Sequence, residues 1–275
     1  MSRTVLTLLK YKNTEKIDVF IHGEELFSSS EVLQAIENDG ISWDDLKLID
    51  YSKKSLYNKD LRDFNNIKND LEKYKVILLK SHSYLKDKYQ RMKFIIKNKI
   101  SSVDTSIPRD KTIRESPKQK RLRVEGNRPN LSNFKILLEK SKVPRPIYFV
   151  NLIKTRDIAI YPAGYKGKQI SGKKALNIYS RIAYKYNPMH ENKFIYFSEA
   201  KNTMADNTGT ETDWETVAIV KYKSFASLQD FNNEPMFKRA FVHKDAGIDK
   251  TYVYATFSTN KNAKFHEEYI TKSIR

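Results

Sequence analysis

The sequence predicts an α+β protein, because short β-branched strands and amphipathic helices alternate along most of the chain. The clearest strand lies at residues 217–220, where Val-Ala-Ile-Val is flanked by charged residues, a composition typical of a strand with a buried face. Phe225, Leu228 and Phe231 follow at three-residue spacing, which places one apolar stripe on a helix. Residues 251–257 then alternate and are aromatic, which predicts a closing strand.

The other elements of the C-terminal half follow the same rules. Ser224 is the expected N-cap of the helix just described, and Pro235 separates it from a second helix that ends near Gly247. Upstream, the pattern predicts a strand at 147–153, a helix at 175–186 and a strand at 194–197. Residues 145–258 are therefore expected to form a β-α-β-β-α-β unit with its four strands in one antiparallel sheet.

The N-terminal half is expected to hold a second set of strands and helices. The predicted strands are 4–11, 19–21 and 76–79, with a strand or turn at 46–49, and the predicted helices are 31–36 (capped by Ser30), 61–74 and 84–96. Two pairs of strands end alike: residues 7–10 resemble 151–154, and residues 76–81 resemble 217–222. We interpret this as a degenerate internal duplication that makes strands 4–10 and 76–80 neighbours. The alternative is a coincidence between short strands that end in lysine.

Several short motifs carry a family resemblance over about residues 145–258. They are Trp214-Glu215, Lys-Tyr-Lys-Ser at 221–224, Glu234-Pro235, His-Lys-Asp-Ala-Gly-Ile at 243–248, Val-Asn-Leu-Ile-Lys at 150–154, Tyr161-Pro162, Ser171-Gly172, and Ala175 with Tyr179. With these motifs the stretch resembles the bacterial domain-of-unknown-function family 1330. Two features depart from that family: Lys223 replaces a usual proline, and a usual glycine pair is absent near 192–193.

The resemblance implies a ferredoxin-like fold of the dimeric α+β-barrel superfamily, in which two sheets pair into a barrel. It also implies a small organic ligand in the barrel, with no cofactor, and leaves open whether turnover follows binding. A tandem copy would form the barrel within one chain as a pseudo-dimer, whereas a single copy would need a homodimer. The expected organisation is an α+β domain at 1–100, a basic linker with a short helix (131–140) at 101–143, the ferredoxin-like domain at 144–258 and a polar tail at 259–275.

The net charge of +18 points to acidic partners, and half of it lies in residues 86–128, which hold 14 Lys or Arg and 5 Asp or Glu. The densest run contains Lys118, Lys120, Arg121 and Arg123, which are the candidate phosphate contacts of an alternative, nucleic-acid-associated function. The competing interpretation is a solvated linker with few apolar residues. A third hypothesis is a structural assembly module without a ligand.

Five residues are candidates for the small-molecule site. His243 is a potential general base with Asp245 to orient it, although residues two apart on a helix do not share a face. Asn151 and Tyr179 could bond a ligand and Trp214 could form an apolar wall, but each could equally be a packing residue. The five histidines show no metal-ligand spacing, so no metal is expected. Without cysteine, a secretory leader or a long apolar run, the protein is expected to be cytoplasmic, with no membrane partner.

Overall fold

The computed structural model describes residues 3–12, 17–30, 32–34, 41–80, 131–140, 145–163, 165, 167–210 and 213–259. The predicted helix at 84–96, the basic residues Lys118, Lys120, Arg121 and Arg123, most of the linker and the polar tail lie outside these residues. The short helix expected at the end of the linker is present as α4 (Leu131–Lys140).

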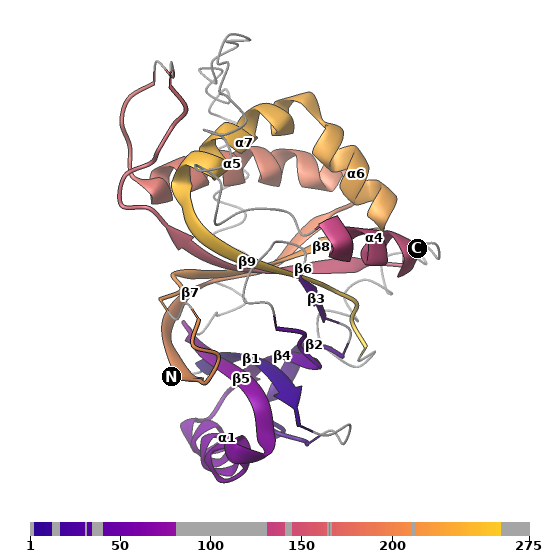
Figure 1. Cartoon of the computed structure of the whole chain (residues 1–275), viewed down its shortest axis with the longest axis vertical. Helices are drawn as coiled ribbons and strands as arrows, with labels where there is room; N and C mark the ends of the chain where they lie inside the picture. Colours follow the sequence, from indigo (N-terminus) through magenta and orange to yellow (C-terminus); the bar gives the residue numbers. More distant parts are fainter. Residues whose placement is uncertain are drawn as a thin grey trace.

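The C-terminal half has the predicted order of elements (Figure 1). They are β6 (Ile147–Thr155), α5 (Gly172–Tyr186), the 3-10 turn η3 (Asn187–His190), β7 (Lys193–Asp206), β8 (Thr216–Tyr222), α6 (Phe225–Asn233), α7 (Pro235–Gly247) and β9 (Ile248–Thr256). The four strands pair antiparallel in the order β7-β8-β6-β9, which confirms the single antiparallel sheet expected for residues 145–258. Ser224 caps α6 as predicted, because its side chain accepts a bond from the Ser227 N–H.

The N-terminal half departs from the sequence prediction in several places. Its elements are β1 (Arg3–Tyr11), β2 (Glu24–Ser29), β3 (Val32–Gln34), β4 (Asp45–Tyr51), α1 (Lys54–Ile67), the 3-10 turn η1 (Lys68–Asp70) and β5 (Leu71–Leu79). The helix predicted at 31–36 is wrong at residues 32–34, which form a strand because they pair with β9. The strand predicted at 19–21 is a loop, and the helix predicted at 61–74 lies earlier, because residues from Leu71 onward pair with β1 and β7.

Strand order in the N-terminal half is β2-β4-β1-β5. The expected pairing of the first strand with the strand around residues 76–80 is confirmed, since β1 and β5 are antiparallel neighbours. Matching residues 76–81 to 217–222 equated β5 with β8, the third strand of the other half, and this was wrong: β5 is the last of the four strands β1, β2, β4 and β5, and the third of them is β4, which flanks β1 on the other side. Both the third and the fourth strand lie beside the first in this topology, so adjacency alone could not distinguish them.

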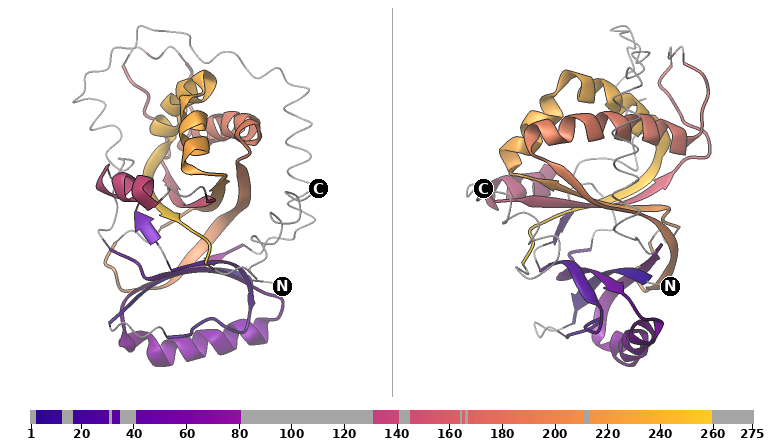
Figure 2. Two further views of the ribbon diagram at one scale, coloured as in Figure 1. Left: turned by 90° about the vertical axis from the view of Figure 1, so that its right-hand side faces the viewer. Right: turned by 180° about the vertical axis from the view of Figure 1, so that it is seen from behind.

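The two halves join at two seams. Beyond Glu199, β7 leaves β8 and pairs with β5, and β3 pairs with β9 on the other side. In the described residues, the nine strands form one sheet in the order β2-β4-β1-β5-β7-β8-β6-β9-β3. Because β2 and β3 are consecutive in the chain, the two ends of this order lie near each other and the sheet curves round on itself, although β2 and β3 do not pair in the described residues. Helices α5 and α7 cover one outer side and α1 covers the opposite side (Figure 2).

The two halves also share their register. The pair Thr4–Leu79 in β1 and β5 corresponds to Tyr148–Thr256 in β6 and β9, and both strand pairs then shift register at matching positions, Lys10/Tyr11 and Lys154/Thr155. The second and third strands of the two halves match in the same way. Their register shifts lie between Glu25 and Phe27 in β2, and between Phe194 and Tyr196 in β7.

The two tryptophans of the chain occupy corresponding places in the two halves. Trp43 lies two residues before β4, and Trp214 lies two residues before β8. Each is followed by an acidic residue whose backbone N–H bonds the corresponding carbonyl of the first strand: Asp44 to Leu9 at 2.9 Å and Glu215 to Ile153 at 3.0 Å.

The space on the inner face of the curved sheet is occupied by side chains from both halves. Tyr148 from β6, Phe27 from β2 and Tyr254 from β9 belong to this cluster together with both tryptophans, and the rings of Phe27 and Tyr148 lie 4.8 Å apart. Each large apolar side chain buried in this way contributes roughly 1.5–3 kcal/mol to stability. Room for a ligand must therefore be sought where this packing ends. None of the described helices has the length and apolar character needed to cross a membrane.

Candidate functional site

A groove lies beside the seam at which β7 passes from one half to the other. It is lined by residues 201–206 of β7 together with Asp213 and Trp214, and its volume is about 700 Å³. Residues 200–206 of β7 pair with β5, and Trp214 leads into β8. The lining residues all come from the C-terminal half, but the part of β7 that carries most of them is paired with β5 of the other half, and the volume is in the range of small-molecule sites.

A largely buried ion pair lies at the wall of this groove. Lys75 projects from β5 toward the inside of the sheet, on the same face as Ile77 and Leu79, and its ammonium lies 3.0 Å from the Asp206 carboxylate and 3.0 Å from the Thr210 hydroxyl. Asp206 is fixed in turn, because its other oxygen accepts bonds from the backbone N–H and the hydroxyl of Thr208 at 2.7 and 2.6 Å. Burying two charges is unfavourable unless each is well compensated, so this arrangement indicates a specific role.

Two aromatic rings complete the surroundings of Lys75. The rings of Trp214 and Tyr252 lie 4.7 Å apart, and the Lys75 ammonium lies 5.8 and 5.5 Å from their centroids, within the range of a cation–π contact. The indole N–H of Trp214 is buried and has no hydrogen-bond partner. An unpaired buried N–H is unfavourable, and the indole N–H of Trp43, away from the groove, is in the same state; only that of Trp214 belongs to a groove-lining residue.

The predicted ligand-binding residues do not converge on this groove. Trp214 lines it, whereas Asn151 projects from the opposite face of the sheet, where its amide donates to the carbonyls of Phe149 (2.9 Å) and Ala218 (3.2 Å). Tyr179 lies on that same helix-covered side, packed against Phe237 and Phe241, and burial raises its pKa well above the usual value. Asn151 and Tyr179 therefore lie on the helix-covered side of the sheet, apart from the groove, and their role in ligand binding stays a prediction.

His243 lies on α7, where it faces the loop after β6, and it is separate from both of these places. The partner of its Nδ1 is the Tyr161 hydroxyl at 2.8 Å, and the Tyr161 ring stacks on Tyr165. Burial lowers the pKa of His243, and its Nε2 is buried without a hydrogen-bond partner. Tyr161 therefore takes the position at His243 that was predicted for Asp245.

Sequence reasoning missed Lys75, Asp206, Thr210 and Tyr252. One signal for Lys75 was present: it lies on the apolar face of a strand, two residues before Ile77 and four before Leu79. Asp206 could not be associated with it, because the two residues are 131 positions apart and meet only through the pairing of β5 with β7.

Comparisons with known proteins give limited further information. No model of a protein family matches the chain, and no curated protein matches its sequence. The resemblance to family 1330 therefore remains a prediction.

Solved structures with a similar backbone include the methylated RPA0582 protein, with a TM-score of 0.43 and 19% sequence identity; the match covers 49% of this chain and 95% of that chain. RPA0582 from Rhodopseudomonas palustris, a protein of unknown function, gives a TM-score of 0.40 and 20% identity, over 46% of this chain and 92% of that chain. An anthrone oxidase-like protein matches 94% of this chain and 92% of its own, with a TM-score of 0.39 and 10% identity. Similarity at this level does not bear on ligand or reaction.

Proposed function

We propose that the protein is a single-chain α+β barrel, made of two ferredoxin-like halves, that binds a small organic molecule in the groove beside Trp214. Binding is the activity that this geometry supports. The pseudo-dimer takes the place of the homodimer that the family resemblance implies, because each half supplies the sheet face that a second subunit would supply.

The matching of the two halves supports an internal duplication. Strand order, pairing register and the positions of two register shifts agree between them. Trp43 and Trp214, each followed by an acidic residue, correspond as well. Coincidence between two short lysine-ended strands would not reproduce these features together. The halves also differ: β1 connects to β2 without a described helix where β6 connects to β7 through α5, one helix (α1) stands where the other half has α6 and α7, and β3 has no counterpart.

The single observation that carries the binding proposal is the Lys75–Asp206 pair behind the groove, with the unpaired indole N–H of Trp214 at its wall. An aromatic wall favours a planar ligand, while the indole N–H and the lysines favour accepting oxygens. The groove lining holds Lys201 and two aspartates; Asp206 is already paired with Lys75, and Asp213 lies 3.9 Å from the Lys154 ammonium, which leaves Lys201 to favour an anion. The proposed ligand class is therefore a small aromatic carboxylate or phenolate.

The two tryptophans provide a direct test. In Trp43→Phe only Trp214 remains as a fluorophore, and titration with benzoate, 4-hydroxybenzoate and related acids should change its emission in a saturable way. In the matched variant Trp214→Phe, emission should not respond, and the affinity measured by calorimetry should fall by about tenfold or more, the effect of roughly 1.4 kcal/mol. Equal responses from both variants, or no binding by the folded wild-type protein across the set, would exclude the groove as this site.

A further inference from the structure

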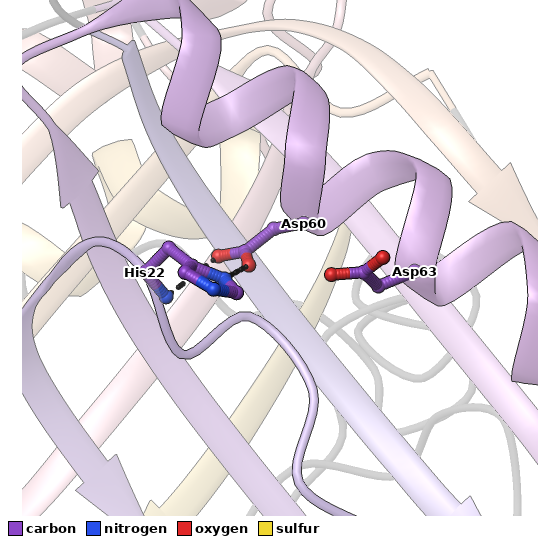
Figure 3. A group of neighbouring side chains, drawn as sticks. All are labelled: His22, Asp60 and Asp63. Atoms are coloured by element: carbon purple, nitrogen blue, oxygen red, sulfur yellow. Dashed lines mark hydrogen bonds and ion pairs between the residues drawn. The ribbon is translucent and has the colours of Figure 1, made fainter.

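A second cluster of potential ligands lies far from the groove, on the outer side of the N-terminal half. His22, Asp60 and Asp63 each offer one ligand atom, and these atoms lie within 4.8 Å of one another (Figure 3). Asp60 and Asp63 are three residues apart on α1 and so share a face of the helix, while His22 comes from the loop between β1 and β2. Sequence spacing could not reveal this set, because the histidine is 38 residues from the nearer aspartate.

Asp60 holds the imidazole in place. Its side chain is 1% exposed, and one oxygen accepts bonds from the His22 backbone N–H at 3.0 Å and the Tyr51 hydroxyl at 2.7 Å. Its other oxygen contacts His22 Nδ1. His22 and Asp60, two of the three potential ligands, are therefore held at fixed positions before an ion binds.

The open side of the cluster faces solvent. Asp63 is exposed, and the His22 side chain is 26% exposed, so an ion can enter and keep water ligands. The loop that carries His22 is anchored beside it: Phe20, which has a left-handed backbone (φ 57°), packs on Phe64 of α1 with the rings 5.4 Å apart. The imidazole is therefore presented to α1 at a fixed place.

We propose that His22, Asp60 and Asp63 bind a divalent transition-metal ion of the Zn²⁺ type. One imidazole nitrogen with carboxylate oxygens is a ligand set for such ions, whereas Mg²⁺ favours oxygen ligands and retains its water. The ion ties the loop at 17–23 to α1. This loop occupies the place in the chain that α5 holds in the other half, so the metal fixes a connection that has no helix of its own.

The test compares zinc binding by the full-length protein and two matched variants after treatment with a chelator. Asp63→Asn and the control Asp70→Asn both change an exposed carboxylate in the α1–η1 segment, and both variants are expected to fold. Calorimetry with zinc sulfate should show one site in the wild type and in Asp70→Asn, and an affinity at least about tenfold lower in Asp63→Asn. Zinc should raise the melting temperature of the first two proteins and have a much smaller effect on the third.

His22→Gln should lose zinc binding as Asp63→Asn does, and magnesium chloride at the same concentration should leave all four proteins unchanged. Three results would overturn the proposal: equal zinc affinity in wild type and Asp63→Asn, no zinc binding by folded wild type, or a preference for magnesium.

Discussion

Replacing Lys75 by methionine should be one of the most damaging single changes in the protein. Methionine keeps most of the length and volume of the side chain but removes the charge, which leaves the Asp206 carboxylate buried without its partner at 3.0 Å. Loss of one member of a buried pair destabilises a protein by about 3–5 kcal/mol. At roughly 2–4 °C per kcal/mol for a chain of this size, the melting temperature should fall by about 10 °C.

The assay is a double-mutant cycle measured by urea unfolding. Asp206→Asn alone should also destabilise the protein, because it leaves the ammonium without its carboxylate, while the amide oxygen can still accept from Thr208. The double variant should be more stable than the sum of the single effects predicts, with a coupling energy of at least about 2 kcal/mol. Lys223→Met serves as the control. Lys223 pairs with Glu191 at the surface, where the side chains are 50% and 64% exposed, so its loss should change stability by less than about 1 kcal/mol.

Additive effects in the cycle, or a cost for Lys75→Met no larger than that for Lys223→Met, would refute this reasoning. Such a result would mean that water reaches the pair and screens it, and that the groove wall is far more polar than its buried residues indicate.

Three further predictions concern other parts of the chain. Gly172→Ala should lower the free energy of unfolding by several kcal/mol, about the range of overpacking and strain effects. The reason is that a Cβ there would lie 2.3 Å from the Arg156 carbonyl oxygen and 2.5 Å from that of Gly247. Urea unfolding close to that of the wild type would contradict this prediction. His243 has a pKa lowered by burial from its ordinary 6.5, so the unfolded state binds the proton more readily. Stability should therefore decline as pH falls below about 6.5, and His243→Gln, compared at pH 7.5 and 5, should lack that part of the decline. If the segment 86–128 binds nucleic acid, affinity should fall steeply between 50 and 200 mM salt, and neutralising Lys118, Lys120, Arg121 and Arg123 should flatten that slope; an unchanged slope would exclude these residues as phosphate contacts.

Local pattern was sufficient for the C-terminal sheet but not for the N-terminal half. Val217 and its neighbours are apolar on both faces, so their strand was readable from composition alone. Val32 and Leu33 form a strand only because β9 offers an edge more than 200 residues away, and a three-residue strand has no periodicity of its own. The duplication was visible in β1 and β6, but insertions change the spacing elsewhere, so β5 was matched to the wrong strand.

The candidate site was harder to predict for the same reason. Trp214 was identified from its motif, but its partners Lys75, Asp206 and Tyr252 come from three different strands. Asn151 and Tyr179 were selected on residue type. Only the alternation of β6 shows that Asn151 points toward the helices rather than toward the inner face of the sheet. The matching positions of Trp43 and Trp214 were the strongest unused signal in the sequence.

The two seams, β5 with β7 and β3 with β9, also bear on how the protein avoids aggregation. Strands joined at these seams do not offer their backbone groups to another chain there. Separating the halves would break both seams and expose strands β5 and β9, which are rich in buried aromatic and aliphatic residues. Each isolated half would then have two open edges and an uncovered apolar face, which is the state in which strands exchange between molecules. β5 and β9 gain their second partner strands only when both halves are present. Synthesis of the second half therefore completes the strand pairing of the first.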